Sequence, residues 1–194
     1  MRYFLKSRYV VQVVLVLLLV SGLLGLWQGT LLYLPLPDFI PTLARSIPAD
    51  AVLVACAVTA IALAAYPTTR IWEQVAPRGV LACSHLLAVS LGLFACLTFS
   101  AACLWGPASG PVLVKLLGLL GLVSILYRPL GPYVSLLPPS FLLLTTVFAR
   151  RPGGDFAPWA WLFDAHPNPT QVLLTCALAG LVALALQRWG PKGR

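Results

Sequence analysis

The chain has 194 residues, of which 60% are hydrophobic and 9% are charged, and its formal net charge is +8. A soluble domain carries roughly a quarter charged residues, so this chain has too few polar side chains to cover a water-soluble surface. Its basic residues flank apolar runs, which excludes a nucleic-acid partner and favours orientation in a lipid bilayer. The composition predicts an all-α polytopic membrane protein.

A helix needs about 20 apolar residues to cross the hydrocarbon of a membrane, and six apolar segments of the chain approach that length. The first is expected to be a retained helix, because its apolar run is too long for a signal peptide and no A-x-A cleavage site follows. The loop after it contains four prolines and is expected to lie at the membrane surface. A single transmembrane domain over residues 1–194 is predicted, with helices at about 9–27, 47–66, 80–105, 111–127, 133–149 and 170–187.

The basic residues predict the orientation of these six segments. Six crossings put both termini on one side, and placing that side in the cytoplasm leaves nine basic residues inside and four outside. This asymmetry satisfies the positive-inside rule, and Arg150 and Arg151 are the local exception. Because the chain prefers arginine to lysine, as proteins from GC-rich genomes do, we expect a bacterial protein of the inner (cytoplasmic) membrane, with multiple passes.

The predicted outer loop at 150–169 is rich in aromatic residues. Tryptophan prefers the membrane interface, where its ring is buried and its N–H stays wet. We therefore expect Trp159, Trp161 and the neighbouring Phe163 to anchor one short helix in the outer interface, bounded by Pro158 and Pro167.

Few polar groups fall inside the predicted spans. His85 near the start of the third segment is expected to bond a neighbouring carbonyl. Lys115, near the start of the fourth, is expected to snorkel to the interface, with a helix–helix or substrate contact as the alternative. Pro138 and Pro139 either start the fifth helix or kink it beside a cavity. These four residues are the candidate pathway or helix contacts.

Motifs for catalysis are weak. The five cysteines lie in apolar runs without a CxxC pair, so no disulfide, metal site or cofactor is expected. Ser109, Asp164 and His166 could form a hydrolytic trio, but Asp164 and His166 lie in a proline-rich loop that favours a turn. There is no ATP-binding motif, so the chain is not expected to be an enzyme, and any ATP hydrolysis would occur on a partner.

The stretch "AYPTTRIWEQVAPRG" at residues 65–79 concentrates charge between two apolar segments. Pro67 can begin a helix, and Pro77 and Gly79 end it. Residues 67–79 are therefore predicted to form a short amphipathic element on the inner surface. It is either an interfacial turn or a coupling helix that docks on a soluble partner through Arg70, Trp72, Glu73 and Arg78.

This architecture resembles the permease subunits of type-2 ABC exporters of bacteria. The resemblance lies in six spans, a long outer loop after the first, the inner stretch, and the runs "RIWEQVAPRGVLACSHLLAVSL" and "VLVKLLGLLGLVSILYRPLGPYVSLLPPSFLLL". It implies a homo- or hetero-dimer of membrane subunits that works with a separate ATPase subunit, and a docking role for residues 69–77. The chain is short for this class.

Three functions are consistent with the sequence. The first is the permease subunit of an exporter of a hydrophobic or amphipathic substrate. The second is a non-catalytic membrane subunit or immunity-type protein that binds a partner in the bilayer. The third, a small membrane enzyme using Ser109 or His166, ranks last.

Overall fold

The structure is a computed structural model that describes residues 9–27, 29–33, 46–66, 78–103, 109–148 and 157–189. Over these ranges the chain is predominantly helical, which confirms the predicted helical class. The described elements are α2 (Val10–Leu26), β1 (Leu31–Tyr33), β2 (Ser46–Pro48), α3 (Ala49–Ala65), α5 (Arg78–Cys103), α6 (Ser109–Leu130), the 3-10 helix η1 (Gly131–Leu136), α7 (Leu137–Phe148) and α8 (Pro169–Trp189).

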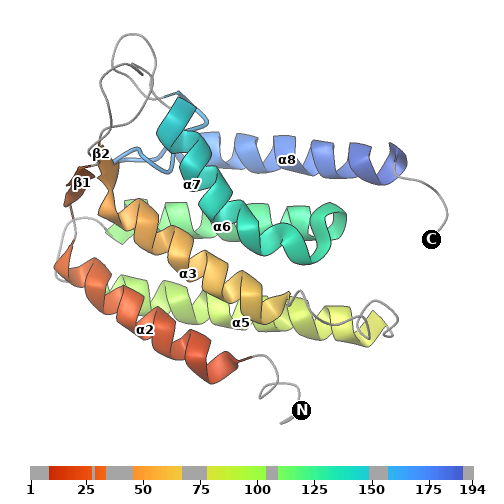
Figure 1. Ribbon diagram of the computed structural model, residues 1–194, viewed down its shortest axis with the longest axis horizontal. Coiled ribbons are helices and arrows are strands. Elements are labelled where there is room, and N and C mark those ends of the chain that lie inside the picture. The colour runs from red at the N-terminus through yellow and green to blue at the C-terminus, as the bar shows by residue number, and fades with distance from the viewer. Residues whose placement is uncertain are drawn as a thin grey trace.

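The helices form two layers. In Figure 1, α2, α3 and α7 lie in front of α5, α6 and α8. The central helices α3 and α6 pack on each other across the layers, and α3 also contacts α2, α5 and α7. Successive long helices run in opposite directions, so α2 begins at the same end of the bundle at which α8 ends. We call this the inner end and the opposite end the outer end, following the orientation predicted from the charges.

Small side chains explain why α3 occupies the centre. Its buried positions include seven alanines, Ala49, Ala51, Ala55, Ala57, Ala62, Ala64 and Ala65. Residues of this size let helix backbones approach closely, which membrane helices use in place of a hydrophobic driving force. Four helices, α2, α5, α6 and α7, therefore pack against α3, whose remaining face carries the exposed Cys56 and Leu63.

The bundle is closed at its outer end by a two-stranded antiparallel ribbon that the sequence did not predict. Leu31 pairs with Pro48 and Tyr33 with Ser46. The amide of Ala49 also donates to the carbonyl of Thr30 over 3.1 Å. The ribbon thus fixes the segment after α2 beside the first turn of α3.

The fifth predicted segment differs from one helix over 133–149. Residues 131–136 are a 3-10 helix, entered through Gly131 at φ +56°, and α7 starts only at Leu137. Pro138 and Pro139 therefore occupy the first turn of α7, where backbone N–H groups have no intrahelical acceptor. The stretch "RPLGP" between the fourth and fifth predicted segments belongs to the end of α6 and the start of η1. The 12 residues of α7 rise about 18 Å, well short of a 30 Å hydrocarbon core.

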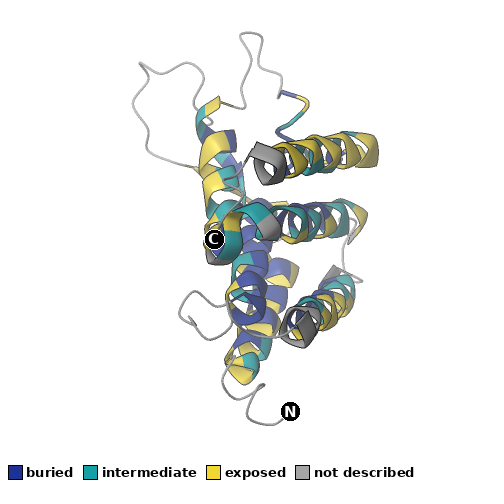
Figure 2. Cartoon of the chain, turned by 90° about the vertical axis from the view of Figure 1, so that its right-hand side faces the viewer, coloured by how far each residue is buried: buried dark blue, intermediate teal, exposed yellow. Residues whose placement is uncertain are grey.

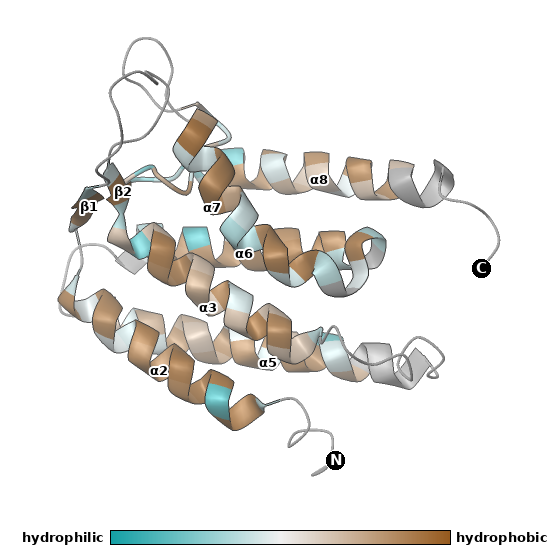
Figure 3. Cartoon of the chain, in the orientation of Figure 1, coloured by the Kyte–Doolittle hydropathy of each residue, from teal (hydrophilic) through white to brown (hydrophobic). Residues whose placement is uncertain are grey.

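The outside of the bundle is apolar. Figure 2 shows exposed positions along the outward sides of the helices, and Figure 3 shows that these helices are hydrophobic over most of their length. The exposed side chains include Leu15, Leu19, Leu93, Leu97 and Leu178, each more than half exposed. A helix that is apolar all round suits either a protein core or a membrane, and these faces are not in a core.

Two helices are long and apolar enough to cross a membrane, Cys83–Ala102 within α5 and Gly110–Tyr127 within α6. The other apolar helical stretches of the described chain are shorter, at 10–17 residues.

The outer loop contradicts the expectation of a surface helix. Residues 157–168 form successive turns, with amide-to-carbonyl bonds from Ala160 to Ala157 and from Phe163 to Ala160. Trp161 is 1% exposed and Phe163 is 3% exposed, and both belong to the main core. The loop therefore plugs the outer end of the bundle. Trp161 is not an interface anchor, because the ring packs inside against Phe141.

Candidate binding sites at the two ends of the central helix pair

An ion pair joins the central helices at the outer end. Lys115 Nζ on α6 lies 2.7 Å from Asp50 Oδ2 on α3, and the two side chains are 1% and 19% exposed. The other carboxylate oxygen of Asp50 accepts the amide of Ala51 over 2.9 Å. Asp50 lies in the first turn of α3, where the helix dipole also favours a negative charge. The carboxylate of Asp50 thus compensates the charge of Lys115, and the lysine side chain does not reach the surface.

The pair lines a cavity of about 440 Å³ at the outer end of the bundle. Its volume falls in the range of about 300–1,000 Å³ typical of small-molecule sites. The polar side chains on its wall are Thr30, Asp50, Lys115 and His166, and the remainder of the wall is mainly apolar. An ammonium has three donors, and among the described residues Lys115 donates to Asp50. The cavity can therefore offer hydrogen bonds to a ligand without separating the pair.

The inner end of the same helix pair carries a cluster of aromatic rings. The phenol oxygen of Tyr66 shares a hydrogen bond of 3.0 Å with Nδ1 of His85. The rings of Tyr66 and Tyr127 stack with centroids 3.9 Å apart, and His85 meets both rings edge-on. These side chains come from the end of α3, from α5 and from α6, so the cluster joins three helices.

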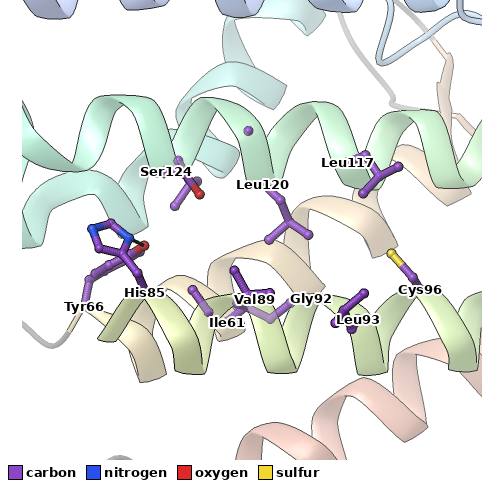
Figure 4. A pocket seen from close by; sticks show the side chains of 13 residues that line it. Ile61, Tyr66, His85, Val89, Gly92, Leu93, Cys96, Leu117, Leu120 and Ser124 are labelled. Carbon is purple, nitrogen blue, oxygen red and sulfur yellow. Dashed lines mark hydrogen bonds between the residues drawn. The ribbon is translucent and has the colours of Figure 1, made fainter. Parts of the chain in front are cut away.

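A second cavity, of about 270 Å³, extends from this cluster between α5 and α6. Figure 4 shows His85, Tyr66 and Ser124 gathered at one end, and Leu117 and Cys96 at the other. Apolar side chains and Gly92 line the part between. The cavity therefore has a polar end and an apolar body.

Most of the predicted docking stretch lies outside the described residues. This holds for Arg70, Trp72 and Glu73, whereas Arg78 is the first residue of α5 and its side chain is not described. The end of α3 and the start of α5, which flank the stretch, both lie at the inner end of the bundle (Figure 1). The structure thus describes the helices that the stretch connects, α3 and α5.

The structure does not assemble the hydrolytic trio in the part of the chain that it describes. Asp164 Oδ1 accepts the backbone amide of His166 over 3.0 Å, which closes a local turn. The side chain of Ser109 is not described. Among the described residues, no group of three His, Cys, Asp or Glu side chains lies close enough together to hold a metal ion.

Sequence reasoning singled out Lys115 and His85 but missed their partners, Asp50 and Tyr66. One signal was available for the first pair. Asp50 and Lys115 are opposite charges, both near helix ends that the orientation placed on the same side. No comparable signal marks Tyr66, because a tyrosine at a helix end is also typical of a membrane interface.

Comparisons with known proteins add no relative: no family model, no curated protein and no solved structure matches this chain.

Proposed function

We propose that this chain is a multi-pass protein of the bacterial inner membrane and the permease subunit of an ATP-driven exporter. ATP would be hydrolysed by a separate subunit, and two membrane subunits would form the translocation unit. The alternating helices and their apolar exposed faces support the membrane location. The export class rests on the architectural resemblance and on the ion pair described above.

The Asp50–Lys115 pair is the observation that carries this proposal. Ionisable side chains inside a membrane bundle are expensive, and they mark substrate or ion pathways by default. Here the pair lies between the two central helices and borders a cavity of small-molecule size. A purely structural protein of this composition could have used apolar side chains at both positions, often without loss of stability.

The position of α3 suggests how a partner could move the ion pair that lines the outer cavity. Asp50 is in its first turn, at the outer end, and Tyr66 follows its last turn, immediately before residues 67–77. A helix is a stiff rod, so a displacement of the inner stretch would move the ion pair at the other end. The docking residues Arg70, Trp72, Glu73 and Arg78 would receive that displacement from the ATPase.

Purification of the tagged chain in mild detergent, followed by mass spectrometry of bound proteins, tests this function. The wild type would be compared with the double variant Trp72→Ala/Glu73→Ala, and with Asp164→Asn as a charge-changing control on the outer loop. We expect an ATPase to accompany the wild type and the control and to be absent from the double variant. Absence of any nucleotide-binding protein from all three samples would refute the exporter.

A non-catalytic subunit that binds a partner in the bilayer is the second candidate. It is favoured by α8, whose main packing partner among the described elements is α6. The side chains Leu173, Leu174, Leu178 and Leu181 on α8 are all more than half exposed. The same purification separates the two functions, because this candidate predicts an integral membrane partner and no ATPase.

A further inference from the structure

The cavity between α5 and α6 differs from the outer cavity in the kind of polar side chain on its wall. Its polar side chains are Tyr66, His85 and Ser124, all at the inner end. No Asp, Glu, Lys or Arg is among the described residues that line it. A carboxylate or phosphate bound there would meet no Lys or Arg side chain among the described residues of the wall, which disfavours burying its charge.

The shape of the cavity is elongated because its lining follows one stripe on each helix. On α5 the stripe runs from His85 to Cys96, about 16 Å of helix rise, and on α6 it runs back from Ser124 to Leu117. The two helices are antiparallel, so both polar residues meet at one end and both apolar ends meet at the other (Figure 4). Gly92 lies in the middle, where a Cβ atom would be 3.2 Å from Cδ1 of Leu120, so the two helices approach closely there.

The rim of the cavity faces the apolar surroundings of the bundle. Val89 and Leu93 are each 61% exposed, and Leu117 is 57% exposed. These residues lie on the two helices that are long enough to cross a membrane. In a bilayer the opening would therefore face lipid rather than water, and the occupant would enter sideways from the hydrocarbon.

We infer that this cavity is a binding site for a single-chain lipid with an uncharged head group, taken from the surrounding bilayer. The hydroxyl or carbonyl oxygen of the head group bonds Ser124 and the Tyr66–His85 pair, and the tail lies along Gly92, Leu117 and Leu120. The inference rests on the membrane location proposed above and is independent of transport.

Photolabelling in the bilayer tests the site. The full chain would be reconstituted in phosphatidylcholine vesicles with a monoacylglycerol that carries a diazirine in its tail, irradiated, and digested for peptide mapping. We expect labelling to concentrate on residues 88–96 of α5 and 117–124 of α6. Excess unlabelled monoacylglycerol should compete, and a fatty acid at a pH where it is ionised should not.

Three variants make the test specific. Gly92→Leu should lower the labelling of these peptides by about tenfold or more, because the new side chain fills the cavity. Gly22→Leu is the matched control and should leave it unchanged, since a side chain at Gly22 meets nothing within 4 Å. Ser124→Ala removes the hydroxyl that bonds Tyr66 and would bond the head group, with minimal change in packing, and should lower the labelling about three- to tenfold.

Several outcomes would overturn the inference. Labelling spread over exposed faces such as α8, and equal in Gly92→Leu and Gly22→Leu, would show ordinary lipid contact. Equal competition by the ionised fatty acid would refute the uncharged head group. Carbonate extraction of cell membranes comes first. A chain released as soluble protein would refute the membrane location, whereas a retained chain without site-specific labelling would refute the lipid site alone.

Discussion

The contact between α3 and α6 is stabilised by different side-chain chemistry at its two ends. At the outer end, Asp50 and Lys115 exchange full charges next to a cavity of about 440 Å³. At the inner end, Tyr66, His85 and Tyr127 meet through the hydrogen bond between Tyr66 and His85 and through stacked and edge-on rings. An ion pair stabilises the contact between two helices only while both charged side chains remain together, whereas the cluster of rings at the inner end keeps other contacts when one is lost. The outer end is therefore suited to switching, and the inner end to holding the helices together.

The largest effect in this comparison is expected when the ion pair is broken from one side. Asp50→Asn leaves the ammonium of Lys115, 1% exposed, without a counter-charge, and should destabilise the protein by ~3–5 kcal/mol. Lys115→Met should be milder, because the carboxylate of Asp50 is 19% exposed and keeps its bond to the amide of Ala51. Reversible unfolding in mixed micelles measures both values.

The double variant Asp50→Leu/Lys115→Met is the decisive control for that prediction. Apolar residues of similar volume often replace a buried ion pair without loss of stability, so the double variant should be close to the wild type. If both single variants and the double variant were equally unstable, packing and not charge would hold the outer end, and the comparison with the inner end would fail.

A second prediction concerns Trp161, which plugs the outer end beside Gly118. A Cβ atom on Gly118 would lie 2.8 Å from the indole ring, so the fit is close. Trp161→Ala should cost ~3–5 kcal/mol through the cavity that it leaves. Trp161→Phe should cost much less, because the buried indole N–H finds no acceptor among the described residues, and removing it recovers a penalty of about 1–3 kcal/mol.

Thermal unfolding of both Trp161 variants in detergent would check this difference. Equal losses of stability in the two variants would indicate that the indole N–H has a hydrogen-bond partner, and that this bond contributes more than the packing of the ring. Equal stability of all three proteins would mean that the loop does not plug the bundle.

The helical class of this protein followed from its composition, because a chain with so few charged residues and apolar segments of this length has few other ways to satisfy its backbone. The side-chain contacts between helices could not be predicted from the composition. A helix that is apolar on all sides gives no sign of which face points inward, so the sequence could not rotate Lys115 toward Asp50. The prediction that Trp161 lies at the membrane interface was wrong for a related reason, because aromatic residues suit the membrane interface and the protein core equally well. The strands escaped notice because Pro48 lies in one of them and both are only three residues long.

The smallest expected effect tests the inner end. Tyr66→Phe keeps the ring, which is 2% exposed and stacked on Tyr127, and removes only the hydroxyl that bonds His85. The loss should be about 1–3 kcal/mol, because the imidazole nitrogen is left without its partner. Adding His85→Leu to Tyr66→Phe should then cost less than His85→Leu costs in the wild type, since the shared bond is lost only once. Unfolding of the four proteins in the same micelles completes the cycle. A coupling energy near zero would show that this hydrogen bond contributes nothing to the contact between α3 and α5 at the inner end.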